Sequence, residues 1–277
     1  MYDTGAAPHS AVTSPARRFW RPFLALLGLG LFGLLSLPLI LVPQIAQLLA
    51  DGALPPRTSV LALTALSLLG PAIMLLVAVA GGVLLAPRVG LRSHLAAWAG
   101  ADPRPTRSLL TEVPLAVGLG LVAGLLIVAV DRALTPLVEG FGALQAQQPP
   151  LVLRLVAGVF YGGIVEELLL RWGLMTLLVW AGWRLLQGGR GAPQAGLVAV
   201  AALLSAVVFG ALHLPALAAQ LPLTPLLVAR TVLLNALGGL VYGWLFWRQS
   251  LEAAMVAHAA THVGFALAGL VLDSTGL

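Results

Sequence analysis

The chain has 277 residues, of which 60% are hydrophobic and only 9% are charged, and its mean hydropathy is +0.99. A soluble domain carries about a quarter charged residues, so this composition excludes a globular surface that faces water. The net charge of +5 comes from arginines scattered singly between apolar runs, which excludes a nucleic-acid-binding patch, and the absence of cysteine excludes disulfides and thiolate metal sites.

Lipid is therefore the expected solvent of this chain. Only helices and closed barrels satisfy their backbone hydrogen bonds in lipid, and the long Leu, Ala, Val and Gly runs show no strand-like alternation. We predict an all-α fold, a polytopic transmembrane helix bundle. A bilayer core of about 30 Å needs about 20 apolar helical residues, which gives about seven spans here, within a range of six to eight.

The N-terminal stretch is polar, and we predict that residues 1–16 form a disordered cytoplasmic segment. The apolar run after it is too long for a signal peptide and should stay attached as the first span. The expected spans are Phe23–Val42, Val60–Leu85, Leu109–Val130, Leu151 to about Trp180, Gly196 to about Leu217, Leu226–Trp247 and Ala253–Leu272.

The positions of the arginines predict the orientation, because cytoplasmic loops are enriched in Lys and Arg. With seven spans and a cytoplasmic N-terminus, the outer loops hold only Arg57 and Arg132. The inner loops hold Arg17, Arg18, Arg21, Arg88, Arg92, Arg104, Arg107, Arg184, Arg190 and Arg248. Splitting the fourth segment into two crossings would spoil this asymmetry, so we predict one long or bent helix there.

Ionisable residues divide the chain into two regions. Residues 17–150 should form N-terminal transmembrane helices that are almost free of buried charge, with Glu112 near an interface. Residues 151–277 should form the site-bearing region, because a charge at the bilayer centre costs at least about 2.5 kcal/mol and marks function by default. Its ionisable residues within apolar segments are Glu166, Glu167, Arg171, His213, Arg230, His258 and His262.

Glu167 and Arg171 have the favoured spacing for an ion pair on a helix, with the acid four residues before the base. We interpret them as a structural ion pair, because either partner alone would be an uncompensated buried charge. Glu166 then points about 100° away around the helix and can face a cavity, where a carboxylate can take a proton from water. Arg230 has no partner that the sequence reveals, and we interpret it as snorkelling to an interface.

Three histidines complete the set. His213 is followed by Pro215, so it should lie where a helix ends or kinks. His258 and His262 are four residues apart and share one face of the last span. The glycine pairs Gly162-Gly163 and Gly238-Gly239 are most simply close-packing sites between helices.

These motifs, taken in order, resemble those of the CPBP intramembrane proteases, which comprise the type II CAAX prenyl endopeptidases and the bacteriocin-processing or Abi-like immunity-type bacterial proteases. The resemblance covers roughly Leu151–Leu272, and its motifs are Glu166-Glu167-x-x-x-Arg171, Phe209-x-x-x-His213 and His258-x-x-x-His262. It implies that Glu166 activates water, that His213 holds this water and that His258 donates to the oxyanion. The family commonly has Asn where this chain has His262.

Two forms of catalysis remain open at this stage. Glu166, His213, His258 and His262 could activate water without a metal, with His262 as a second hydrogen-bond donor to the oxyanion. The same four residues are also a plausible ligand set for zinc, which would make the protein a metalloprotease. We favour the metal-free form, so the expected cofactor is none or zinc.

We therefore predict an intramembrane endopeptidase of the bacterial cell (inner) membrane, with membrane lipid and a peptide or protein substrate as partners and no nucleic acid. The substrate is membrane-associated, either prenylated or of the bacteriocin type, and we place the cavity opening on the cytoplasmic side. Helical rise puts His213 near the outer face, so this opening requires a tilted helix or a cytoplasmic extension of the fifth span. The alternatives are a proton- or metal-coupled transporter and a non-catalytic immunity-type binder.

Overall fold

The structure is a computed structural model that describes residues 15–100, 108–138 and 149–275, and all regular secondary structure within these ranges is helical. The prediction of an all-α bundle is confirmed. In chain order the helices are α1 (Pro15–Leu34), α2 (Pro38–Ala50), α3 (Val60–Leu85), η1 (Ala86–Arg88), α4 (His94–Gly100), α5 (Leu109–Leu134), η2 (Thr135–Leu137), α7 (Leu151–Ala157), η3 (Gly158–Glu166), η4 (Leu168–Met175), α8 (Thr176–Leu186), α9 (Ala195–Ala211), α10 (Leu214–Ala218), α11 (Pro225–Arg248) and α12 (Leu251–Thr275).

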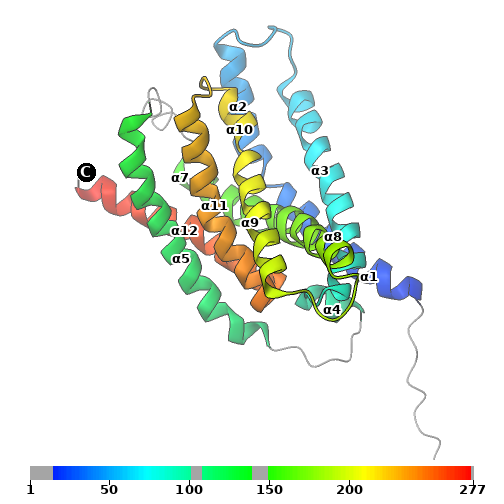
Figure 1. The fold of residues 1–277 in the computed structure, drawn as a ribbon. Coiled ribbons are helices and arrows are strands. Elements are labelled where there is room, and N and C mark those ends of the chain that lie inside the picture. The colour runs from blue at the N-terminus through cyan, green and yellow to red at the C-terminus, as the bar shows by residue number, and fades with distance from the viewer. Residues whose placement is uncertain (1–14, 101–107, 139–148, 276–277) are drawn as a thin grey trace, which may run out of the picture.

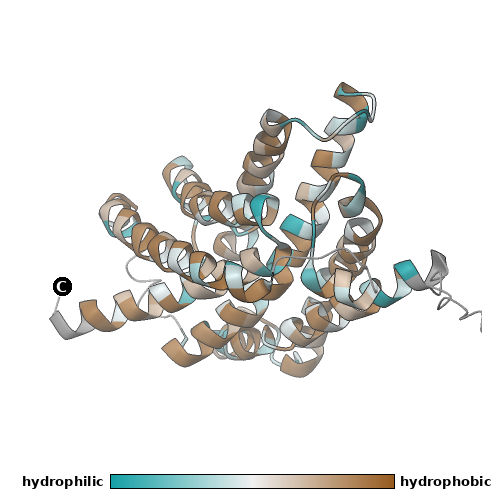
Figure 2. Cartoon of the chain, turned by 90° about the horizontal axis from the view of Figure 1, so that it is seen from below, coloured by the Kyte–Doolittle hydropathy of each residue, from teal (hydrophilic) through white to brown (hydrophobic). Residues whose placement is uncertain are grey.

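Six helical segments of the described chain are long and apolar enough to cross a membrane. Figure 2 shows hydrophobic residues covering these helices on most sides, as expected for a protein whose outer surface faces lipid. The chain is thus an integral membrane protein. The six segments are Arg18–Ala50, Val60–Arg88, Leu109–Leu137, Ala195–Ala218, Pro225–Arg248 and Leu251–Leu272.

The predicted fourth span is a continuous helical run from α7 to α8, over residues 151–186. Its middle is wound as a π-helix, in η3 and η4, with Glu167 between the two pieces. We call residues 158–175 the π-helical segment, which contains Glu166, Glu167 and Arg171. π-Helix is rare and occurs mostly at functional sites. The sequence predicted a long or bent helix but gave no sign of the π winding.

The first predicted span, Phe23–Val42, is wrong in detail. The helix stops at Leu34, and a turn over residues 35–37 separates it from α2, which begins at Pro38. Proline suits the first turn of a helix because its missing N–H would have no partner there. The predicted disorder of residues 1–16 falls mostly outside the described residues, and α1 already includes residues 15 and 16.

Small residues bring α5 against α12 over much of their length. A Cβ at Gly124 would lie 2.6 Å from the carbonyl oxygen of Thr261, so only glycine permits this approach. Thr261 also donates a hydrogen bond of 3.0 Å to the carbonyl oxygen of Gly120. In lipid such close contacts replace the hydrophobic effect as the force that holds helices together. They fix the position of α12, which contains two of the candidate histidines.

Polar contacts tie the helices together at one end of the bundle, which we call the α5 C-terminal end. The carboxylate of Asp131, in the last turns of α5, forms an ion pair with Arg230, in the second turn of α11. The interpretation of Arg230 as a snorkelling residue is therefore wrong, because its partner is distant in sequence. Figure 1 places the links from α2 to α3 and from α10 to α11 at this end.

The opposite end, the α5 N-terminal end, has its own polar cluster. Glu112 is buried, accepts a hydrogen bond from Ser250 and lies 3.4 Å from Arg92 and 3.2 Å from His94. Glu252 accepts hydrogen bonds from the backbone N–H groups of His94 and of the residue after it. The expectation of Glu112 near an interface missed these partners, which join the segment before α4 to the starts of α5 and α12.

Candidate functional site

The two neighbouring acids of the π-helical segment have different surroundings. Glu166 is partly exposed, with 17% of its side chain accessible, and it lines a cavity of the described chain. The side chain of Glu167 is fully buried, and its Oε1 lies 3.1 Å from Nη1 of Arg171. The predicted ion pair is confirmed, and the two acids point in different directions as expected.

His258 lies between the two carboxylates. Its Nδ1 is 2.8 Å from Oε1 of Glu167, and its Nε2 is 3.8 Å from Oε2 of Glu166. Oε1 of Glu167 also faces the guanidinium of Arg171, which can only donate, so we assign this oxygen as an acceptor and Nδ1 of His258 as the donor. The hydrogen bond to Glu167 holds the His258 ring so that Nε2 points toward Glu166 in the cavity. One carboxylate thus positions the histidine that faces the other carboxylate.

Arg171 is enclosed by aromatic rings as well as by its acid. Its guanidinium lies 5.1 Å from the ring centre of Phe209 and 5.2 Å from that of Tyr242, within the range of cation–π attraction. It also donates a hydrogen bond of 2.9 Å to the carbonyl oxygen of Gly239. A fully buried charge is thereby compensated from α11 and α9, which fixes the π-helical segment relative to both helices.

His262 stacks on His258, with ring centres 5.3 Å apart and planes at 14°. The rings pack against a surface without side chains, because a Cβ at Gly162 would lie 2.8 Å from Nε2 of His262 and 3.2 Å from Nε2 of His258. A Cβ at Gly158 would also clash with the His262 ring. The glycine at position 162 thus leaves room for the two histidine rings, since any side chain there would displace them.

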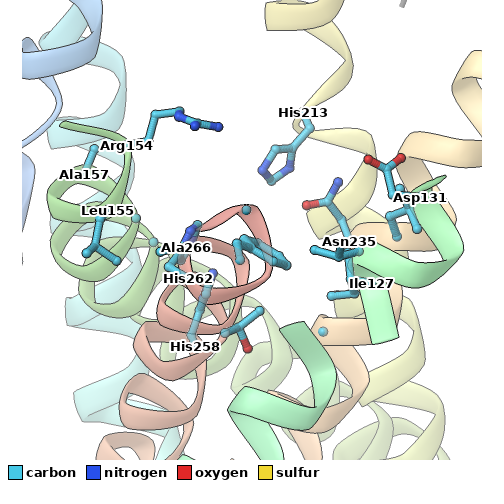
Figure 3. A pocket seen from close by; sticks show the side chains of 18 of the residues that line it. Ile127, Asp131, Arg154, Leu155, Ala157, His213, Asn235, His258, His262 and Ala266 are labelled. Carbon is cyan, nitrogen blue, oxygen red and sulfur yellow. The ribbon is translucent and has the colours of Figure 1, made fainter. Parts of the chain in front are cut away.

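His213 lies at the end of α9, where the chain turns before α10, as its position before Pro215 predicted. Its Nδ1 is 2.8 Å from the carbonyl oxygen of Phe209, which can only accept, so Nδ1 carries the proton and Nε2 is an acceptor. It forms no ion pair with Glu166, although the structure describes both residues. Figure 3 shows His213 extending into the cavity from the side opposite His258 and His262.

The four predicted residues share one cavity of about 1040 Å³. Sequence reasoning missed several other lining residues: Asp131, Arg154, Asn235 and Tyr242 (Figure 3 labels the first three). Tyr242 is buried and stacks on His258 at 4.4 Å, and the only sign of it in the sequence was a tyrosine inside an apolar span. The cavity also takes walls from α2 and α5, in the region that the sequence predicted to be almost free of buried charge.

The arrangement does not fit the zinc site that the sequence allowed. Within the described residues, no three His, Asp or Glu side chains converge in a way that could hold a metal ion. Nδ1 of His258 is already engaged by Glu167, and the 3.8 Å between its Nε2 and Glu166 is an ion-pair spacing. The metalloprotease interpretation is therefore not supported by these side chains.

Comparison with known families gives one result. Residues 148–264 match the model of the type II CAAX prenyl endopeptidase Rce1-like family. This region is an Rce1-like domain. The predicted resemblance is confirmed, and the Rce1-like domain contains the π-helical segment and all four candidate site residues. No curated protein and no solved structure matches the chain.

The chain is thus a membrane protein with an Rce1-like CAAX protease domain, and this domain implies a membrane protease that acts on a peptide substrate. The Rce1-like domain does not account for the whole cavity. Asp131 of α5 and Gln44 of α2 line it from outside the matched residues.

Proposed function

We propose that the chain is an intramembrane endopeptidase that hydrolyses a peptide bond of a membrane-associated substrate with water activated by Glu166. The proposal depends mainly on one observation, the position of Nε2 of His258 3.8 Å from Oε2 of Glu166 at the inner end of a cavity. This pairing, with His258 held by a second carboxylate, supports acid and base chemistry. The cavity volume of about 1040 Å³ can admit an extended peptide segment.

In the proposed reaction, Glu166 takes a proton from a water molecule whose oxygen attacks the peptide carbonyl carbon. His213 accepts the second hydrogen of this water through Nε2 and so orients it across the cavity. When the tetrahedral intermediate collapses, the C–N bond breaks and Glu166 returns its proton to the leaving amine. The products are a carboxylic acid and an amine, which become a carboxylate and an ammonium by exchanging one proton, so protons and electrons balance without a further reactant.

The oxyanion would be stabilised by the stacked histidines. Because Glu167 holds the proton of His258 on Nδ1, His258 would donate from Nε2 only as an imidazolium, next to the Glu167 carboxylate. His262 has no such constraint on its ring and can present an N–H to the oxyanion while neutral. It would thus replace the amide of the Asn that the family commonly has, and such donors typically contribute 10²–10³ in rate.

The first test is cleavage of fluorogenic peptides by the purified protein in detergent, with matched prenylated and unprenylated substrates. We expect wild-type protein to cut at one peptide bond, identified by mass spectrometry, and Glu166→Gln to bind the same peptide without product. A strong zinc chelator should leave the rate unchanged. Binding without cleavage by wild type would favour the immunity-type binder, and substrate-coupled ion movement in liposomes would favour the transporter.

A further inference from the structure

The cavity is lined by the π-helical segment, α11 and α12, and on each of them its innermost lining residue is a residue of the site. The last lining residue of the π-helical segment is Glu166, that of α11 is Tyr242, and the first of α12 is His258. Every other lining residue of these segments lies on the side of the α5 C-terminal end. The cavity therefore reaches inward from this end and stops at the site.

Dense packing fills the bundle beyond the site. Trp172 follows Glu167, Phe246 follows Tyr242, and Ala254 precedes His258, so each lies toward the α5 N-terminal end. All three are almost completely buried, with exposed fractions of 2% or less. The Glu112 cluster then closes the far end of the bundle by joining the starts of α5 and α12. In the described chain this path is closed to a substrate.

The open end is formed by α5, α7, α11 and η2. Its polar residues include Asp131 and Arg132 near the end of α5, Thr135 in η2, and Arg154 in α7. The ion pair of Asp131 with Arg230 holds the ends of α5 and α11 together at this opening. Figure 3 shows Arg154 extending from α7 toward the cavity, and Figure 1 shows this end of the bundle opposite the link from α8 to α9.

The two ends differ in the number of arginines. Arg18, Arg21, Arg88, Arg92, Arg184, Arg190 and Arg248 belong to the α5 N-terminal end, and the sequence adds Arg17, Arg104 and Arg107 to the same set of loops. The open end has Arg57, Arg132, Arg154 and Arg230, of which Arg230 pairs with Asp131 and Arg154 faces the cavity. Because Lys and Arg in loops remain cytoplasmic, this asymmetry places the closed end inside the cell.

We infer that the cavity opens on the extracytoplasmic side of the membrane and takes substrate segments presented at that face, such as an exported peptide or the outer juxtamembrane part of a membrane protein. This replaces the expectation of a cytoplasmic opening, which conflicts with the arginine positions once the cavity is placed in the bundle. It rests on the proposed function only in calling the occupant of the cavity a substrate.

The absence of cysteine in the chain makes the access side directly measurable. The single-cysteine variants are Thr135→Cys at the opening, Asn235→Cys within the cavity and Ala192→Cys in the link from α8 to α9. They are labelled in intact expressing bacterial cells with a small, charged, membrane-impermeant thiol reagent. The unsubstituted chain is the background control.

We expect Thr135→Cys and Asn235→Cys to react in intact cells, and Ala192→Cys to react only after permeabilisation. The reverse pattern would overturn the inference, and so would reaction of all three in intact cells. Reaction of Thr135→Cys without Asn235→Cys would overturn the access route. Labelling needs no catalysis, so the access side is established even if the peptide assay shows no cleavage, and cleavage in detergent is independent of orientation.

Discussion

Glu167 and His258 are joined by a hydrogen bond of 2.8 Å between Oε1 and Nδ1, although 91 residues separate them in the sequence. The same oxygen lies 3.1 Å from Nη1 of Arg171. Glu167, which the sequence predicted only as the partner of Arg171, therefore also holds His258, the histidine that faces Glu166. Its substitution should affect both folding and the position of the His258 ring.

Glu166→Gln should abolish cleavage while leaving the fold intact. The amide cannot take a proton from water, and loss of a general base typically costs 10²–10⁴ in rate. Glu166 is partly exposed, and among the described residues its one ion-pair contact is that with His258, so the melting temperature in detergent should change little. Full activity in this variant would disprove the proposed base.

Glu167→Gln and Arg171→Met should each reduce stability by about 3–5 kcal/mol, because each leaves an uncompensated charge in a buried site. The double variant should lose less than the sum of the two single losses, since it removes both charges together. Reversible unfolding in mixed detergent micelles measures this cycle. Additive losses would show that the pair is not coupled.

Gly158→Ala should lower kcat by displacing the His262 ring, since the new methyl group would occupy the same space. Gly118→Ala is the matched control, because no atom lies within 4 Å of a Cβ at that position of α5. Alanine favours helix over glycine by about 1 kcal/mol, so the control should be neutral or slightly stabilising. Equal rates in the two variants would argue against a role for the His262 ring position.

His262→Asn should keep most of the activity, whereas His262→Ala should lose about 10²–10³ in kcat, the typical contribution of one oxyanion donor. The amide supplies the N–H that the family commonly has at this position, and alanine supplies none. Steady-state kinetics with the cleavable peptide separate kcat from KM. A similar loss in both variants would show that His262 acts in another way.

Arg230→Gln should destabilise the open end of the cavity, because it leaves Asp131 without its cationic partner. The side chain of Arg230 is 7% exposed and that of Asp131 is 21% exposed, so the loss should be smaller than at the fully buried pair, about 1–2 kcal/mol. Thermal melting in detergent measures it. Asp131→Asn combined with Arg230→Gln should recover part of the stability, and a further loss in the double variant would contradict the pairing.

Local patterns accounted for much of the site. The spacing of Glu167 and Arg171 predicted their ion pair because partners four residues apart meet on any helix of ordinary pitch. The order of the three motifs along the late spans predicted the family. The same local reasoning failed for Arg230 and Glu112, whose partners lie on other helices and are therefore invisible in a pattern of neighbours.

Sequence alone determined that the chain is a helical membrane protein, that its charges are concentrated in the late spans and that its arginines define two unlike ends. These properties follow from composition and local spacing, since lipid penalises each exposed polar group wherever the chain places it. Only the tertiary structure decided that Glu167 holds His258, that glycines of the π-helical segment make room for two stacked rings, and that the cavity opens at the arginine-poor end. Each of these depends on which helices lie side by side, and helix packing is determined by shape across the bundle rather than by any pattern within one span.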